Sequence, residues 1–202
     1  DVDRLAIVTE KGEMFGEEYT LVAVADYVLK HTPGNTVSNL SSTRALKDVA
    51  GRYGQPCYAA AVGEVNVVAM MKETRAVIGG EDSGHMIFTD HHSTGDGIIT
   101  ALQLISAMLR SGKPLSELAR LMDVLPQKLI NIDVKSKPDI ATVPEIVAAI
   151  RQVEAELGEQ GRVLVRYSGT QNMCRVMVEG PTKEQTEKCC SHIADAVRAA
   201  LA

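Results

Sequence analysis

The sequence has no tryptophan and few other aromatic residues: Phe, Trp and Tyr make up only 3% of its 202 residues. A hydrophobic core must therefore be built from aliphatic side chains and methionine. Two further patterns are missing, a run of the ~18 apolar residues that a membrane-spanning helix needs and a secretory signal peptide. A basic excess is also missing, since the formal net charge is -5. This disfavours a nucleic-acid-binding protein, although local arginines and lysines could still bind an anionic substrate.

The four cysteines are few and form no C-x-x-C pair. They are Cys57, Cys174, Cys189 and Cys190. We therefore expect reduced, partly buried thiols in a cytoplasmic protein. Hydrophobic residues make up 45% of the chain and charged residues 23%, which argues against disorder. The length allows one large domain or two small ones.

Apolar periodicity divides the chain into two parts near residue 126. In the first part strands alternate with helices, beginning with a short strand expected at residues 5–8. This alternation predicts an α/β fold, a three-layer βαβ domain with a mixed, mainly parallel sheet. In the second part the order β-α-β-β-α predicts a small α+β C-terminal domain. Its antiparallel hairpin is expected over residues 162–167 and 173–179.

Three helix starts carry capping residues. Asp96 is expected to cap the apolar helix that follows it, and Thr182 the last helix of the chain. Thr142 and Glu145 match a capping box ahead of the helix that runs to Leu157.

The strongest candidate site runs from Arg166 to Arg175. Two arginines flank a loop of small residues, Ser168, Gly169 and Thr170, between two expected strands. Glycine lets the backbone bend so that N–H groups converge, and the hydroxyls add short donors. The arginines can offer bidentate hydrogen bonds to a phosphate. The alternative is a hairpin turn with two surface arginines, and the spacing alone does not decide between the two.

A second candidate is the glycine-rich segment 79–85, which follows an expected strand. Ligands in such sheets bind at the carboxyl ends of the strands. The carboxylate of Glu81 could accept hydrogen bonds from vicinal sugar hydroxyls, while Ser83 and His85 could donate or accept. The alternative, a glycine-rich turn with incidental polar residues, is somewhat favoured by spacing alone. Gly63–Glu64 is a further candidate loop at a strand end.

The first residues form a weaker candidate for a metal site. Asp1 and Asp3, just before Arg4, lie two residues apart and could reach one Mg2+ ion. Most D-x-D sequences are nevertheless solvated turns. His91 and His92 lack the spacing of metal ligands and are interpreted as loop residues.

Taken together and in this order, the three clusters resemble the α-D-phosphohexomutase superfamily. Its four-domain enzymes carry a phosphoserine loop, a D-x-D-x-D-R metal loop, a G-E-x-S-G-H sugar loop and an R-x-S-G-T-x-x-x-x-R phosphate loop. Here Gly80–His85 corresponds to the sugar loop and Arg166–Arg175 to the phosphate loop. The metal loop is represented only by its tail, Asp1–Arg4. The resemblance covers essentially the whole chain.

The resemblance implies a domain division. Residues 1–15 would end the second, metal-loop domain, residues 16–126 would form the third, sugar-binding domain, and residues 127–202 the fourth, phosphate-binding domain. The first domain and most of the second would be missing, together with the phosphoserine, one metal-loop carboxylate and the acid/base groups. Many members have Glu-Pro where this chain has Gln171–Asn172, a change that leaves both arginines in place.

Different stretches resemble different branches of the superfamily. Residues 83–104 look most like bacterial phosphoglucosamine mutases. Residues 15–66 are closer to a branch variously named phosphomannomutase, phosphoglucomutase or phosphoglucosamine mutase. An origin of the two stretches from different lineages therefore stays open, and the sugar is not fixed by the sequence.

For the intact parent enzyme the resemblance implies an isomerase of carbohydrate metabolism. A phosphoserine gives its phosphoryl group to a hexose monophosphate, the resulting 1,6-bisphosphate turns around, and the other phosphoryl group returns. Conversion of glucosamine 6-phosphate to glucosamine 1-phosphate is expected, with phosphomannomutase or phosphoglucomutase specificity as the alternative. Alone, the chain is expected to be a non-catalytic sugar-phosphate-binding module. The expected partners are these sugar phosphates and the missing N-terminal domains, but neither nucleic acid nor membrane.

The resemblance also assigns roles to single residues. Mg2+ is the implied cofactor, and Arg4 is the implied catalytic residue, because it would approach the transferring group. The residues assigned to the metal are Asp1 and Asp3. Those assigned to the sugar are Glu81, Ser83 and His85. Those assigned to the phosphate are Arg166, Ser168, Gly169, Thr170 and Arg175.

Overall fold

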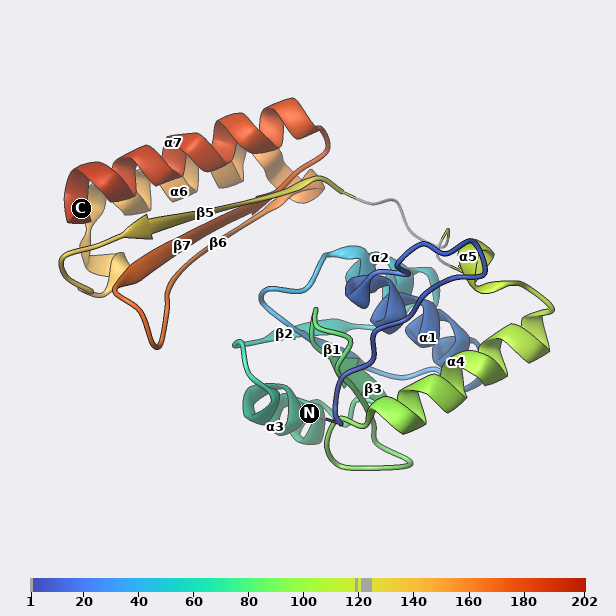
Figure 1. The fold of residues 1–202 in the computed structure, drawn as a ribbon. Coiled ribbons are helices and arrows are strands. Elements are labelled where there is room, and N and C mark those ends of the chain that lie inside the picture. Colours follow the sequence, from blue (N-terminus) through green and yellow to red (C-terminus); the bar gives the residue numbers. More distant parts are fainter. Residues whose placement is uncertain (1, 119, 121–124) are drawn as a thin grey trace. The chain divides into compact units, whose positions relative to one another are not determined.

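The computed structural model describes residues 2–118, 120 and 125–202, and the chain folds as two compact units, Asp1–Asp123 and Val124–Ala202 (Figure 1). The first unit is an α/β domain with helices on both faces of a mixed sheet, and the second is a smaller α+β domain. This architecture confirms the predicted fold class. Within the described ranges, no helix is long and apolar enough to cross a membrane.

The sheet of the first unit has four strands in the order β2-β1-β3-β4. Strand β1 pairs in parallel with both β2 and β3, whereas β4 runs antiparallel to β3. The sheet is therefore mixed and mainly parallel, as predicted. Its strands are β1 (Thr36–Asn39), β2 (Cys57–Ala60), β3 (Ile78–Gly80) and β4 (Met86–Phe88).

Helices cover both faces of this sheet (Figure 1). On one face α1, α2, α4 and α5 share a hydrophobic cluster with Ile78 and Met86 of the sheet. On the other face α3 packs through Met71 against Val37 and Ile87. Met86 and Ile87 reach different clusters because neighbouring residues of a strand point to opposite faces. The helices are α1 (Glu17–His31), α2 (Ala45–Arg52), α3 (Glu64–Thr74), α4 (Gly97–Ser111) and α5 (Leu115–Leu118).

The end of β3 needs a residue without a side chain. A Cβ atom on Gly80 would lie 2.2 Å from the backbone oxygen of His85. Any side chain there would push β3 away from the residue that precedes β4. Gly80 therefore lets the segment 81–85 fold back closely against the strand that it leaves.

The expected strand at residues 5–8 is wrong. The N-terminal segment makes only two isolated antiparallel bridges, Arg4 with His85 and Val8 with Met14. A strand needs a continuous ladder of hydrogen bonds with a neighbour, and the described residues offer this segment only single contacts. One such contact is the backbone N–H of Leu5, which donates to the carbonyl oxygen of Gly84 at 3.2 Å.

The second unit is an antiparallel sheet in the order β5-β7-β6, with two long helices on one face (Figure 1). The helices and sheet share one hydrophobic cluster that includes Ile132, Val176 and Ile193. The elements are β5 (Gln127–Asp133), η2 (Ile140–Thr142), α6 (Pro144–Leu157), η3 (Gly158–Gln160), β6 (Arg162–Tyr167), β7 (Met173–Glu179) and α7 (Lys183–Leu201).

Two of the three predicted helix caps are present. The Asp96 carboxylate accepts two backbone hydrogen bonds at the start of α4, and the Thr182 hydroxyl accepts one at the start of α7. The predicted capping box of α6 is wrong. Thr142 instead donates its hydroxyl to the backbone oxygen of Asp139 at 2.6 Å. The Thr142 backbone N–H donates to the same oxygen at 2.8 Å and closes a short 3-10 turn. Helix α6 begins at Pro144 without a side-chain cap.

Candidate functional site

Two arginines lie directly opposite each other on neighbouring strands of the second unit. The register of β6 and β7 pairs Arg166 with Arg175. Val165 and Val176, their neighbours along the strands, belong to the core under the helices. Because side chains alternate along a strand, both arginines project from the sheet face that α6 and α7 leave open. Like charges directly opposite destabilise a strand pair, so this pair calls for an anionic partner.

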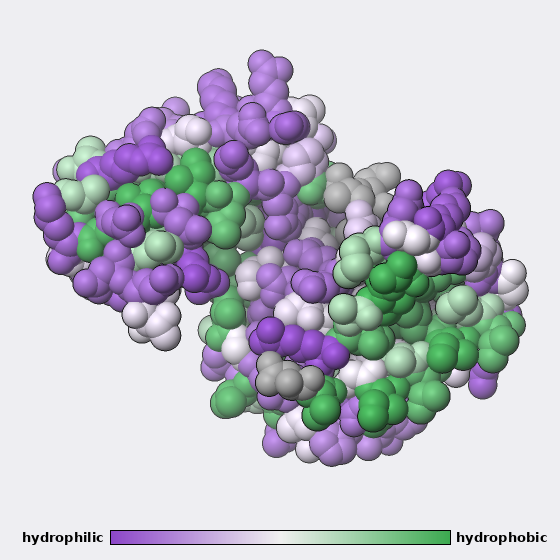
Figure 2. Space-filling model, in the orientation of Figure 1, coloured by the Kyte–Doolittle hydropathy of each residue, from purple (hydrophilic) through white to green (hydrophobic). Residues whose placement is uncertain are grey.

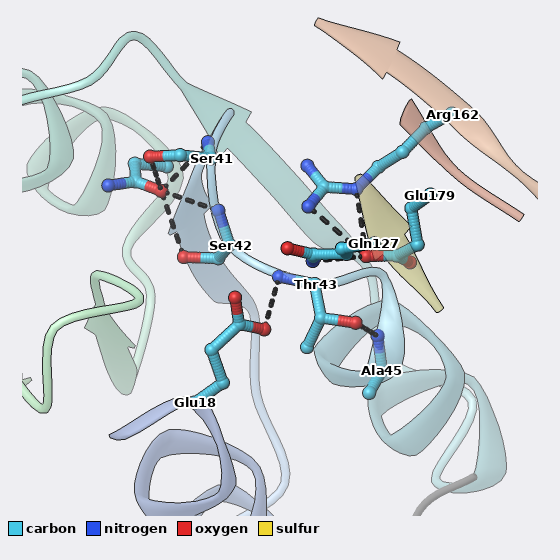
Figure 3. A network of polar contacts seen from close by, with 9 residues as sticks. Glu18, Ser41, Ser42, Thr43, Ala45, Gln127, Arg162 and Glu179 are labelled. Atoms are coloured by element: carbon cyan, nitrogen blue, oxygen red, sulfur yellow. Dashed lines mark hydrogen bonds and ion pairs between the residues drawn. The ribbon is translucent and has the colours of Figure 1, made fainter. Parts of the chain in front are cut away.

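The same face also carries a polar network in which an arginine is paired with a carboxylate (Figure 3). The Glu179 carboxylate accepts hydrogen bonds from Gln127 at 2.6 Å and from Arg162 at 3.3 Å. Within the described part of the chain, neither Arg166 nor Arg175 has a carboxylate within ion-pair distance. The Nε atom of Arg175 is moreover buried without a hydrogen-bond partner. Positive charge is therefore uncompensated at the loop end of this face.

The loop between β6 and β7 is organised around Ser168. Its backbone N–H donates to the Met173 carbonyl oxygen at 2.8 Å, and its hydroxyl oxygen accepts from the Gln171 N–H at 3.2 Å. Gly169 and Thr170 are exposed at the loop tip. Gly169 has no positive φ, and a Cβ atom there would meet nothing within 4 Å. The bend therefore does not depend on glycine, whose contribution is to leave the loop tip uncovered.

Lys137 is a third cation at this loop, which the sequence motif does not contain. Its Nζ donates to the backbone oxygen of Ser168 at 2.9 Å, across 31 positions of the chain. Neither spacing nor composition links residue 137 to the loop, because the contact arises only when β5 joins the sheet beside β7. The loop between β6 and β7 therefore has three cations next to it, which are Lys137, Arg166 and Arg175.

The sugar-loop candidate Glu81 is held firmly at the end of β3. Its Oε1 atom accepts from the side-chain amide of Asn39 at 2.9 Å and from the backbone N–H of Gly63 at 2.8 Å. Asn39 ends β1 and Gly63 precedes α3, so three strand-end segments meet at one carboxylate. This lies at the carboxyl edge of the parallel strands, where ligands of such sheets bind. The sequence analysis missed Asn39, whose only signal is a polar residue at the end of a buried strand.

His85 is the last residue of the sugar loop, and its side chain is buried. Its side chain is 1% exposed, and Nε2 lies 3.2 Å from Oε1 of Glu64. That carboxylate oxygen also accepts from the Gly95 N–H at 3.0 Å. Gly95 leaves room for the ring, because a Cβ atom there would lie 2.1 Å from the His85 Nε2. The side-chain oxygen of Ser83 is also buried, and no described residue bonds to it. Like the Nε atom of Arg175, it is a polar group available to a ligand.

The predicted metal and catalytic residues lie at the N-terminal segment. Asp1 lies outside the described residues, Asp3 is half-buried, and Arg4 is exposed. Arg4 bridges to His85 through the backbone, which attaches this segment to the sugar loop. Among the residues that the structure describes, no three His, Cys, Asp or Glu side chains come together as metal ligands.

The remaining candidate residues are two histidines and the four cysteines. His91 and His92 lie in the turn after β4, as predicted. All four cysteines are free thiols, and burial raises the pKa of each. A raised thiol pKa disfavours the nucleophilic thiolate.

Two family models match the chain. The model described as phosphoglucomutase/phosphomannomutase, alpha/beta/alpha domain III, matches residues 16–125. The model for the phosphoglucomutase/phosphomannomutase C-terminal domain matches residues 129–196. Among curated relatives, a phosphoglucosamine mutase of Syntrophobacter fumaroxidans is 57% identical over 204 residues, which cover 100% of this chain and 45% of the relative. The chain thus spans about half the length of the curated relatives it matches.

Solved structures share the fold. A phosphoglucomutase/phosphomannomutase family protein of Burkholderia thailandensis matches with a TM-score of 0.76 at 23% identity, over 99% of this chain and 45% of its own. An Aspergillus fumigatus N-acetylphosphoglucosamine mutase, in complex with GlcNAc-6P and magnesium, matches with a TM-score of 0.75 at 17% identity, over 98% of this chain and 50% of its own. At these identities the likeness supports the fold alone.

Proposed function

The chain belongs to the phosphoglucomutase/phosphomannomutase family, and we propose that it is the sugar- and phosphate-binding C-terminal part of a phosphohexomutase. The intact enzyme would move a phosphoryl group between the 6- and 1-positions of a hexose. We take glucosamine 6-phosphate as the substrate, because a relative 57% identical is named phosphoglucosamine mutase. Residues 16–126 would form the sugar-binding domain, residues 127–202 the phosphate-binding domain, and residues 1–15 the end of the preceding domain.

The observation that carries this proposal is the facing pair Arg166 and Arg175. A bound phosphate dianion would replace the repulsion between the two guanidinium groups with charge-assisted hydrogen bonds. The free Nε of Arg175 supplies one donor. The exposed loop tip at Gly169 and Thr170 would add backbone and hydroxyl donors, with Ser168 holding the loop in shape. Such a cradle contacts only the phosphate, so it could hold either end of a bisphosphate that turns around.

The sugar would bind at the carboxyl edge of the first unit's sheet. The fixed carboxylate of Glu81 would accept hydrogen bonds from the sugar, and the unbonded hydroxyl of Ser83 would add a donor or acceptor. His85 would hold the loop in place through the contact of its buried ring with Glu64. Positioning of this kind is a large part of catalysis in phosphoryl transfer.

The metal would be held mainly outside the described residues. We propose that Asp1 and Asp3 contribute to a Mg2+ site that the preceding domain completes. Mg2+ would supply Lewis-acid polarisation of the transferring phosphoryl group. Arg4 would approach the same group. Because the phosphoserine loop would belong to the missing domains, the 202 residues alone should show no mutase turnover.

Calorimetric binding of glucosamine 6-phosphate to the 202-residue chain tests this function. We expect weak, saturable binding that Arg175→Ala reduces about tenfold or more, since a charge-assisted contact is lost. Arg151→Ala, which removes an exposed arginine of α6, serves as the matched control and should change nothing.

Equal affinities for the two variants would contradict the assignment of Arg175 to the phosphate. Mutase turnover by the purified chain would contradict the proposal that catalysis needs the preceding domains. Tighter binding of glucose 6-phosphate or mannose 6-phosphate than of glucosamine 6-phosphate would contradict the proposed sugar.

A further inference from the structure

The start of α3 presents a carboxylate among exposed apolar side chains. Glu64 is the first residue of α3, and its side chain is 35% exposed. Val62 (38% exposed) lies two positions before it, and Val65 (80%) follows it. Figure 2 shows hydrophobic residues gathered over α4, where Leu102 and Leu109 are exposed. The start of α3 differs from that surface, because it combines apolar contact area with a negative charge, as ligand sites commonly do.

The described part of the chain engages only one oxygen atom of the Glu64 carboxylate. Its Oε1 accepts from the Gly95 N–H at 3.0 Å and lies 3.2 Å from Nε2 of His85. No described residue bonds its Oε2 atom. Two partners on one oxygen hold the carboxylate in place, while a carboxylate has about four acceptor sites in all. The second oxygen is therefore available to a ligand.

Glu64 lies next to Glu81, the residue proposed to accept hydrogen bonds from the sugar. Gly63, which directly precedes Glu64, donates its backbone N–H to Oε1 of Glu81 at 2.8 Å. Both glutamates thus lie at the carboxyl edge of the parallel strands, where ligands of such sheets bind. Among the residues that the structure describes, no lysine or arginine lies within ion-pair distance of either carboxylate. Such a pair of carboxylates favours a ligand that brings a positive charge.

An amino sugar brings such a charge. Glucosamine 6-phosphate differs from glucose 6-phosphate by an ammonium group in place of one ring hydroxyl. With a carboxylate, an ammonium donor forms an ion pair as well as a hydrogen bond, and hydrogen bonds between charged groups are roughly twice as strong as neutral ones.

We propose that Glu64 is a specificity-determining residue, whose carboxylate binds the ammonium group of a 2-amino sugar phosphate beside the hydroxyls that Glu81 accepts. This inference rests on the proposed function and adds to it the residue that selects the sugar.

The alternative is a purely structural role for Glu64. Its Oε1 atom contacts Gly95, which lies just before α4, and His85 of the sugar loop. Those contacts alone could account for the residue. Glutamine in place of Glu64 keeps an acceptor oxygen for the Gly95 N–H but carries no charge. The variant Glu64→Gln therefore separates recognition of an ammonium group from support of the loop.

Calorimetry with a matched pair of ligands tests the proposal. The affinities for glucosamine 6-phosphate and glucose 6-phosphate would be measured for the wild-type 202-residue chain and for Glu64→Gln. We expect the wild-type chain to prefer glucosamine 6-phosphate by about tenfold. In Glu64→Gln this preference should disappear, because glucosamine 6-phosphate binds more weakly while the affinity for glucose 6-phosphate stays unchanged.

Glu73→Gln is the matched control, because Glu73 is an exposed carboxylate near the other end of α3. This variant should keep the tenfold preference. Its loss in Glu73→Gln as well would reveal a general charge effect and overturn the proposal.

Two further outcomes would overturn the proposal. One is equal affinity of the wild-type chain for the two sugar phosphates. The other is an equal loss of both affinities in Glu64→Gln, which would assign Glu64 to support of the loop. In all of these cases the wild-type chain still binds both ligands, so the proposed function stands. Binding of neither ligand by the wild-type chain would contradict the proposed function itself, and this inference with it.

Discussion

At the scale of single residues, the arginines of the C-terminal sheet differ in their partners. Arg162 is balanced by Glu179, whereas Arg166 and Arg175 face each other. The sequence motif predicted both arginines of the pair. It could not predict that they lie directly opposite, because strand register depends on how the hairpin closes. Nor could it predict Lys137 or Asn39, whose contacts span 31 and 42 positions of the chain.

Lys137 yields a prediction at this scale. Lys137→Met keeps the apolar stem but removes the ammonium group that bonds the Ser168 carbonyl. We expect binding of glucosamine 6-phosphate to weaken by about three- to tenfold, because a positive charge and the anchoring of the loop are both lost. Calorimetry at two salt concentrations measures it, and the salt dependence should become shallower.

Lys135→Met is the matched control for this change. Lys135 lies two positions away, and its Nζ bonds the Ala202 carbonyl oxygen at the end of the chain. Its removal should leave the affinity unchanged. Equal losses for both lysines would indicate a general charge effect and contradict a specific role of Lys137.

At the scale of elements, the alternation of strands and helices was predictable because each element shows its own apolar period. The two errors concern features that depend on a neighbour. Residues 5–8 have the composition of a strand but find only isolated bridges. Thr142 has the spacing of a helix cap, but its hydroxyl donates to the backbone oxygen of Asp139 instead. The sequence showed α4 to be strongly apolar without showing which side would stay exposed.

The packing of α7 on the sheet gives a pH-dependent prediction. Cys190 of α7 is fully buried, and its thiol lies 3.4 Å from the Lys128 carbonyl oxygen and 3.5 Å from that of Val176. Burial raises the pKa of Cys190 from 9.0 to about 11. Between these values the unfolded chain loses the proton while the folded chain keeps it, so stability should fall as pH rises from 9 towards 11.

Urea unfolding at pH 8 and pH 10.5 measures this loss. The wild-type chain should lose on the order of 2 kcal/mol more than Cys190→Ala, since one pKa unit corresponds to about 1.4 kcal/mol. Cys190→Ala should be less stable at pH 8, because it leaves a small cavity, but should respond less to pH. Parallel losses in the two proteins would mean that Cys190 does not govern the alkaline behaviour.

At the scale of the whole molecule, each unit carries one candidate loop. The sugar loop lies at the carboxyl edge of the first unit's sheet, and the phosphate loop joins β6 and β7 of the second. The motifs of both loops were visible in the sequence, whereas the residues that hold the loops in place were not. Glu64 under His85 and Asn39 beside Glu81 come from other strand ends, which only the folded sheet brings together. The chain is accordingly proposed as the binding half of a longer enzyme.

The most direct test of that central claim is an NMR titration of the 202-residue chain. With inorganic phosphate, we expect saturable shifts confined to the amides of residues 166–175 and of the residues that contact them. With glucosamine 6-phosphate, amides of residues 80–85 should shift as well. Absence of any shift in residues 166–175 up to about 10 mM ligand, a range that would detect even weak binding, would contradict the proposed phosphate-binding role of the loop.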